Sequence, residues 1–136
     1  KIMQQWLIAE SHGNTPGDVN VSWPVYIGKL PDGSQVPNQA IAVYDTAHRE
    51  DGRLMDGGIR ISHTGIQIRV RANDYTVGYT KLRDIAIALD GVSQAAVVVN
   101  ANNYVLQSVS RVGPIPLGTD ANNREGFTLN AVCTIT

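Results

Sequence analysis

The last third of the chain, residues 104–136, constrains the fold more than any other segment. Two runs with β-strand character, residues 104–111 and 127–136, flank a polar segment, residues 111–126, that contains prolines and glycines. We therefore predict two strands joined by a long loop that the prolines stiffen. This segment contains no cluster of nucleophiles or metal ligands. A chain that ends on a strand and carries so elaborate a loop favours contacts with other proteins.

Composition narrows the class of protein. A length of 136 residues fits one domain, residues 1–136. Hydrophobic residues make up 43% and charged residues 17% of the chain, which predicts a folded rather than a disordered protein. A net charge of −1 argues against a dedicated nucleic-acid binder and leaves little repulsion between copies. No apolar run approaches the roughly 20 residues that span a bilayer, so no membrane partner is expected.

The N-terminal residue and the single cysteine lead to two further predictions. The chain begins with Lys1 rather than methionine, so we expect a truncated N-terminus, with leading residues missing from this numbering. Cys133 is the single cysteine and has no internal disulfide partner, which favours a reducing compartment. Its position in an alternating strand predicts a small buried hydrophobe rather than a reactive thiol.

The pattern along the chain predicts an α+β fold. The predicted elements are, in order, a helix at 2–12, strands at 24–30 and 40–44, a loop at 45–58, a strand at 65–71, a helix at 75–89, and strands at 95–100, 104–111 and 127–136. Runs of strands mixed with few helices favour a mixed, mainly antiparallel sheet with helices packed on one face.

The strand at 65–71 and the helix after it have the clearest periodicity. Apolar residues alternate along the strand with Gln67, Arg69 and Arg71, which therefore share the opposite face. The helix begins after an Asn-Asp cap and ends at a glycine. Its apolar stripe consists of Tyr75, Tyr79, Leu82, Ile85, Ala86 and Leu89. We expect Tyr75 and Tyr79 in the core rather than on a stacking surface.

Arg69 and Arg71 have two interpretations. They belong either to a solvated outer face of the sheet or to a docking or subunit surface. The second interpretation is attractive because the planar guanidinium pairs carboxylates in two-point contacts. Two arginines are too few to predict DNA recognition, since affinity for the phosphate backbone grows with the number of contacts.

No motif in the chain predicts catalysis. The histidines form no HExxH or His-x-His pattern, and the Gly-x-Ser-x-Gly, Gly-x-Gly-x-x-Gly and P-loop motifs are absent. We therefore expect no enzyme activity, cofactor or metal. The alternative is a small metal-dependent hydrolase built on the 45–58 loop, although irregular spacing among glycines favours a solvated acidic loop. Its candidate ligands are Asp45, His48, Asp51 and Asp56.

Two longer motifs resemble a known family. The first is Ile66-Gln-Ile-Arg-Val-Arg71, followed by Asp74-Tyr75 and a helix of the form Gly78-Tyr-x-Lys81-x-x-x-Ile85. The second runs from Pro114 to Asn130, where Pro-Leu-Gly-x-Asp-x-x-x-Arg leads into a strand. Together they resemble the tail terminators, which are tail-completion or minor capsid proteins of long-tailed bacteriophages. The resemblance covers about residues 24–136, and its motifs are structural rather than catalytic.

The resemblance implies a function in virion assembly. Such proteins have a compact α+β fold and associate as a homo-oligomer, a hexameric ring. The ring stops growth of the tail tube and offers a surface to the head-tail connector protein. DNA then passes through the lumen without sequence-specific binding. The resemblance places the protein in the tail or neck of the virion, and in the host cytoplasm during assembly.

The resemblance also suggests where subunits or partners meet. Asp120 and Arg124 match the family's loop, and Asn130 lies in the strand that follows. With Arg69 and Arg71 they are the candidate subunit or partner interface. A different neck or tail-tube component is the alternative within the same class of protein.

Overall fold

The computed structural model describes residues 1–17, 20–33, 36–50 and 61–136. The chain forms these elements in order: α1 (Ile2–Ala9), β1 (Val25–Ile27), β2 (Ala40–Glu50), β3 (Ser62–Ala72), α2 (Tyr75–Asp90), β4 (Ala95–Val99), β5 (Asn102–Thr119) and β6 (Glu125–Ile135). The predicted order of helices and strands is confirmed.

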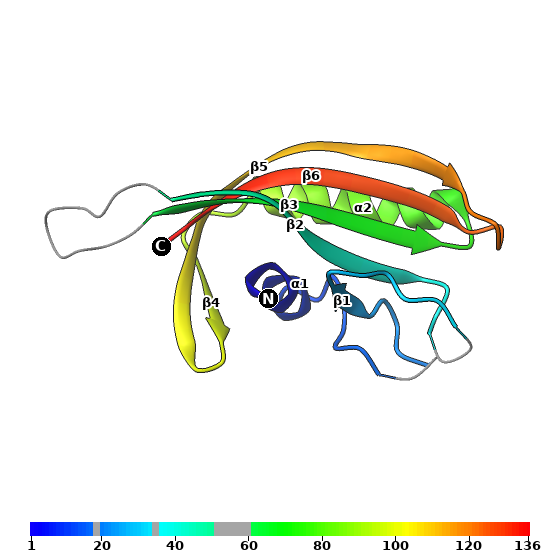
Figure 1. The fold of residues 1–136 in the computed structure, drawn as a ribbon, viewed down its shortest axis with the longest axis horizontal. Coiled ribbons are helices and arrows are strands. Elements are labelled where there is room, and N and C mark those ends of the chain that lie inside the picture. Colours follow the sequence, from blue (N-terminus) through cyan, green and yellow to red (C-terminus); the bar gives the residue numbers. More distant parts are fainter. Residues whose placement is uncertain (18–19, 34–35, 51–60) are drawn as a thin grey trace, which may run out of the picture.

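The strands form one curled sheet with the order β1-β2-β3-β6-β5-β4 (Figure 1). Only β1 and β2 pair in parallel; the other neighbouring strands are antiparallel. The predicted α+β class with a mixed, mainly antiparallel sheet is therefore confirmed. The curl brings the edge strands β1 and β4 to either side of α1, so this short helix fills the opening between them.

Both helices pack on one face of the sheet and share its core. The helix α2 lies along β3, β5 and β6, whereas α1 contacts β1 and β4. Met3 and Leu7 of α1 belong to the same buried cluster as Leu82 and Leu89 of α2. On the strands, Ile68 and Leu129 are fully buried in this cluster, which confirms the predicted inward face of β3. The opposite face of the sheet, here called the outer face, carries neither of the two described helices.

Local sequence explains the bounds of α2. The Asp74 carboxylate accepts a hydrogen bond from the backbone N–H of Thr76 at 3.2 Å and so caps the first turn. Gly91 follows the last turn. The predicted core positions Leu82, Ile85, Ala86 and Leu89 are all buried.

The prediction that Tyr75 and Tyr79 lie in the core is wrong. Their side chains are 50% and 37% exposed, and their rings stack on each other with centroids 6.2 Å apart. Both rings meet the buried Phe127 edge-on, at 5.0 and 6.1 Å. Phe127 fills the core position, and the two tyrosines cover it while keeping their polar ends near water.

The predicted loop at 111–126 is also wrong. β5 continues to Thr119, and the turn that joins it to β6 spans only residues 120–124. The pairing of β5 with β6 shifts register between Val112 and Ile115 and between Pro116 and Gly118. The strand tolerates its prolines because β4 pairs only as far as Leu106. Beyond Gln107, one edge of β5 forms no strand pairing within the described residues, and proline is accommodated at such edges.

The first half of the predicted 45–58 loop is strand as well, because β2 extends to Glu50. A register shift between Asp45 and His48 marks an irregularity in its pairing with β3. Asp51 and Asp56 lie outside the described residues. In the part of the chain that the structure describes, no three His, Cys, Asp or Glu side chains gather in a way that would hold a metal ion.

Candidate interaction surfaces

The outer face of the sheet carries a polar row across three strands. Strand register places Tyr44 of β2, Gln67 of β3 and Asn130 of β6 side by side. Gln67 Nε2 donates to Oδ1 of the Asn130 side chain at 3.3 Å, and Arg69 Nε donates to Gln67 Oε1 at 3.1 Å. The Arg69 guanidinium also lies 5.2 Å from the centre of the Tyr44 ring. These contacts hold Arg69 in place without neutralising it, since no described carboxylate pairs with it.

Exposed apolar side chains flank this polar row. Val112 lies opposite Asn130 in the ladder, and Val132 lies opposite Ser110, so both valines share the outer face. Val112 is 67% exposed and Val132 48% exposed. Ile115 pairs with Thr128 in the same ladder and is 37% exposed. A sheet face that no described helix covers, and that combines apolar side chains with an arginine that no described carboxylate pairs, fits a protein-binding surface.

Arg71 does not belong to this exposed surface. The alternating pattern predicts it beside Arg69 on the outer face, but its side chain is only 5% exposed. Its guanidinium donates to the carbonyl oxygens of Pro31 at 2.8 Å, Pro37 at 2.8 Å and Asn38 at 3.0 Å. The connection between β1 and β2 folds over the end of β3 and covers it. Burial, together with the nearby charge of Arg124, lowers the pKa of Arg71.

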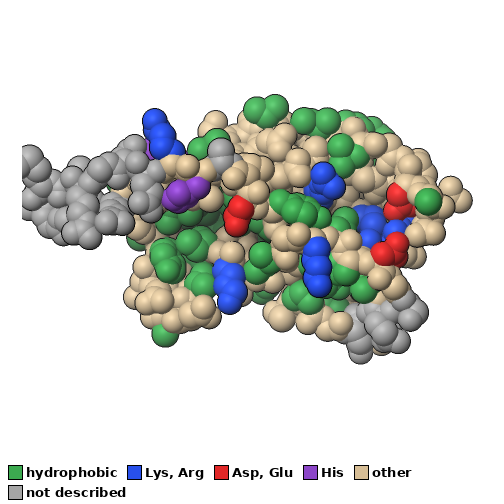
Figure 2. Space-filling model, viewed as in Figure 1, with side chains coloured by type: hydrophobic (Ala, Val, Ile, Leu, Met, Phe, Trp, Pro, Cys, Tyr) green, Lys and Arg blue, Asp and Glu red, His purple; other side chains and the backbone are tan. Residues whose placement is uncertain are grey.

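Asp120 and Arg124 form a cluster at the end of the β5–β6 hairpin. Asp120 Oδ1 accepts hydrogen bonds from the backbone N–H groups of Asn122 and Arg124, both at 2.9 Å, and Oδ2 accepts from Arg124 Nε at 2.9 Å. Arg124 is only 6% exposed and also pairs with Asp32. These hydrogen bonds lower the pKa of Asp120 and of Asp32 and raise that of Arg124. Figure 2 shows acidic and basic side chains gathered at this end of the molecule.

The five predicted interface residues therefore fall into two groups. Arg69 and Asn130 are exposed and lie on the outer face, where the structure brings them together through Gln67. Arg71 and Arg124 are buried, and Asp120 pairs with Arg124. Sequence reasoning missed Asp32 as a partner in the second group. The turn Pro31-Asp-Gly gave no sign of a contact with a residue 92 positions away.

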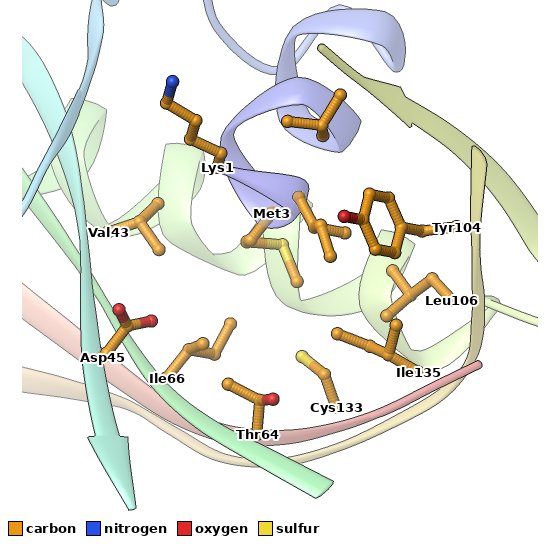
Figure 3. A pocket seen from close by; sticks show the side chains of 12 residues that line it. Lys1, Met3, Val43, Asp45, Thr64, Ile66, Tyr104, Leu106, Cys133 and Ile135 are labelled. Atoms are coloured by element: carbon orange, nitrogen blue, oxygen red, sulfur yellow. The ribbon is translucent and has the colours of Figure 1, made fainter. Parts of the chain in front are cut away.

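A separate cavity opens beside the N-terminal end of α1 (Figure 3). Side chains from α1, β2, β3, β5 and β6 point into it. Most of them are apolar, and Asp45 and Lys1 supply charges at its edge. Cys133 lines this cavity, is 1% exposed, and has a pKa raised to about 12 by burial. The predicted burial of Cys133 is confirmed.

The comparison with protein families decides the identity. A family model described as bacteriophage tail terminator protein matches residues 7–136. The chain belongs to the bacteriophage tail terminator family. Among curated proteins, the sequence has no match. Membership in this structural family assigns the chain to the virion tail, where it interacts with other tail components. Neither helix of the described residues has the length and apolar character needed to cross a membrane.

Proposed function

We propose that this tail terminator ends growth of the tail tube by capping it as a hexameric ring and that the ring forms the head-tail joining interface. The tail tube protein and the head-tail connector are its partners, and DNA passes through the lumen without sequence-specific binding. The hexamer follows from the resemblance to the family. Assembly takes place in the host cytoplasm, and the mechanism is binding alone, with no catalytic residue or cofactor.

The structural observation that best supports this proposal is the exposed surface on the outer face of the sheet. Arg69, Val112 and Val132 lie exposed there, while the helices cover only the other face. A ring requires a patch on one subunit to meet a different patch on the next subunit. The outer face supplies one such patch, with an apolar part and the Arg69 cation, which pairs with no carboxylate among the described residues. A small net charge removes a barrier to close packing of the copies.

The two groups of predicted interface residues have different roles in this proposal. Arg69 and Asn130 contact a neighbouring subunit or partner directly. Arg71, Asp120 and Arg124 shape the end of the sheet on which those contacts depend. We further propose that residues 1–136 act as a single domain, because α1 and α2 contribute to one buried cluster.

The test compares two matched substitutions. Val132→Asp places a charge on the outer face, whereas Ile87→Asp places the same charge on the exposed side of α2, where Ile87 is 59% exposed. The mass of each protein in solution is measured with and without tail tube protein, and rings are sought by electron microscopy. We expect Val132→Asp to block ring formation and Ile87→Asp to leave it intact. A wild-type protein that stays monomeric and does not bind tube protein would contradict the proposal.

One outcome favours the alternative within the same class of protein. If the wild-type protein polymerises by itself into long tubes, it is a tube or neck component rather than a terminator. The test for the hydrolase alternative is a metal titration. Tight stoichiometric binding that is lost in Asp45→Asn would revive that hypothesis.

A further inference from the structure

A hollow on the outer face lies where the β5–β6 hairpin ends. Its volume is about 220 Å³, below the roughly 300–1,000 Å³ typical of small-molecule sites, so it suits a single side chain of a partner protein. Arg69, Arg71 and Arg124 line this space, here called the arginine hollow. Leu117, which is 53% exposed, adds an apolar wall.

The charges around the arginine hollow do not balance. The carboxylates of Asp32 and Asp120 both pair with Arg124. Arg71 donates to backbone carbonyl oxygens, and neither Arg71 nor Arg69 pairs with a carboxylate of the described residues. An excess of positive charge therefore remains beside apolar surface, where it attracts a carboxylate more strongly than it would in water.

A groove between α1 and β4, here called the α1–β4 groove, presents the matching chemistry. Its volume is about 430 Å³, and among the described residues that line it Glu10 is the only charged one. Glu10 is exposed, and its carboxylate forms no hydrogen bond or ion pair with the described residues. Burial lowers the pKa of the nearby His12, so this imidazole is largely uncharged at neutral pH. Val98 lines the same groove and is 58% exposed.

Other exposed carboxylates fit the arginine hollow less well, because a cation already lies near them. Asp84 lies close to Lys81 on α2. Lys1 lines the same cavity as Asp45. No cation of the described residues lines the α1–β4 groove, so Glu10 is the carboxylate that best complements Arg69.

The two surfaces of one chain lie too far apart to meet. The arginine hollow is on the outer face, whereas α1 lies under the opposite face with β4 beside it (Figure 1). The sheet and the buried cluster therefore separate Arg69 from Glu10 of the same chain. A contact between these surfaces joins two copies and is heterologous.

We propose that the arginine hollow of one copy receives Glu10 of a second copy, with Glu10 paired to Arg69 and Val98 packed against Leu117. The inference rests on the self-association in the proposed function and names the two surfaces that meet. Because these surfaces differ, each copy contacts one neighbour through the hollow and another through the groove. Such head-to-tail contacts close into a ring when the rotation between copies allows it.

A charge exchange tests the ion pair. Arg69→Glu and Glu10→Arg should each weaken self-association about tenfold, and the double variant should recover most of the loss. Asp45→Arg and Asp84→Arg are the matched controls, because each reverses an exposed carboxylate elsewhere, and we expect neither to weaken association. The solution mass over a range of concentrations measures association, and circular dichroism confirms that each variant is folded.

Three outcomes count against the proposed contact. Recovery of Arg69→Glu by Asp45→Arg or Asp84→Arg, and not by Glu10→Arg, would overturn the inference. Rings that form normally in both single variants would also overturn it and leave the proposed function standing. A wild-type protein that never self-associates, even with tube protein, would overturn both.

Crosslinking tests the apolar contact in the assembled protein. One protein carries Val98→Cys, and a second protein with a different tag carries Leu117→Cys; Cys133 is buried and is not expected to react. We expect a short bismaleimide to join the two proteins as covalent dimers. The control pairs Leu117→Cys with Ile87→Cys on the exposed side of α2, and it should give few. Equal yields from the two pairs, or no dimers from Val98→Cys with Leu117→Cys, would overturn the inference.

Discussion

The guanidinium of Arg124 forms a two-point contact with the carboxylate of Asp32. Arg124 Nη1 donates to Asp32 Oδ1 at 3.1 Å, and Nη2 donates to Oδ2 at 2.9 Å. The two residues are 92 positions apart, and the contact joins the β1–β2 connection to the β5–β6 hairpin. The outer face therefore ends in a fixed cluster rather than in two independent loops.

Arg124→Gln should destabilise the protein in a pH-dependent way. The hydrogen bonds from the Arg124 side chain lower the pKa of Asp32 below its ordinary value of 3.8. The pKa of Asp120 is lowered first by the backbone N–H of Arg124, which the variant keeps, and less by the charge and side chain of Arg124, which it loses. The stabilising effect of the Arg124 side chain is therefore complete above the ordinary value and is lost as the pH falls through the lower pKa values of the folded protein. Urea unfolding at pH 7 and at successively lower pH measures the difference between wild type and variant. A difference that stays constant down to pH 2 would contradict the assigned ion pairs.

Leu82→Ala should cost about 2–5 kcal/mol of unfolding free energy, because Leu82 is fully buried between α2 and the sheet. Ile87→Ala, on the exposed side of the same helix, should change it by less than about 0.5 kcal/mol. Chemical denaturation measures both. Equal effects of the two substitutions would show that the buried face of α2 is wrongly assigned.

Gly78→Ala should destabilise the protein although alanine favours helix. A Cβ atom at Gly78 would lie 2.6 Å from Cε2 of Phe127, so the ring or the helix must shift. Overpacking of this kind costs about 1–3 kcal/mol, against a gain in helix propensity of about 1 kcal/mol. Gly91→Ala is the control, because its Cβ would meet Ala88 O at an ordinary 3.6 Å. A rise in melting temperature for Gly78→Ala would contradict the close approach of α2 to Phe127.

Arg69→Ala should leave stability nearly unchanged and weaken ring formation, since Arg69 is exposed and forms only surface contacts. Arg83→Ala removes the same charge from the exposed surface of α2 and serves as the control. Thermal unfolding reports on stability, and the solution mass with tube protein reports on assembly. An Arg69→Ala protein that assembles as well as the Arg83→Ala protein would remove Arg69 from the interface.

The Cys133 thiol should react very slowly with disulfide reagents in the folded protein. Its pKa of about 12 leaves almost no thiolate at neutral pH, and its side chain is 1% exposed. Colour development with an aromatic disulfide reagent measures the rate, and the same protein in denaturant provides the fast reference. Rapid reaction of the native protein would contradict the burial of Cys133.

Strong periodicity made much of the fold predictable. The alternation in β3 and the stripe that contains Leu82 depend on local sequence, and both were assigned correctly. The full length of β5 was not predicted, because Pro114 and Pro116 indicate a break in a strand when only local sequence is considered. The strand tolerates these prolines because β4 does not pair with this part of β5. Arg71 has the same place in the alternating pattern as Arg69. It is buried because the β1–β2 connection folds over it, which the pattern does not predict.

The same principle limits prediction of the site. Arg69 and Asn130 were predicted as interface candidates, but their link through Gln67 depends on strand register, which pattern alone does not specify. The pairing of Arg124 with Asp32 depends on two segments that meet only in the folded chain. Residue type therefore identifies the side chains that could bind a partner. Whether such a side chain is exposed to a partner or bonded within its own chain depends on tertiary contacts.

The unpaired edge of β5 has a consequence for the time before assembly. Such an edge invites stray strands from other chains, and at high intracellular concentration this leads to aggregation. Pro114 and Pro116 have no amide hydrogen, so an incoming strand would find gaps in the row of donors. In the proposed assembly role, the two prolines should therefore limit stray strand pairing between newly made subunits at this edge.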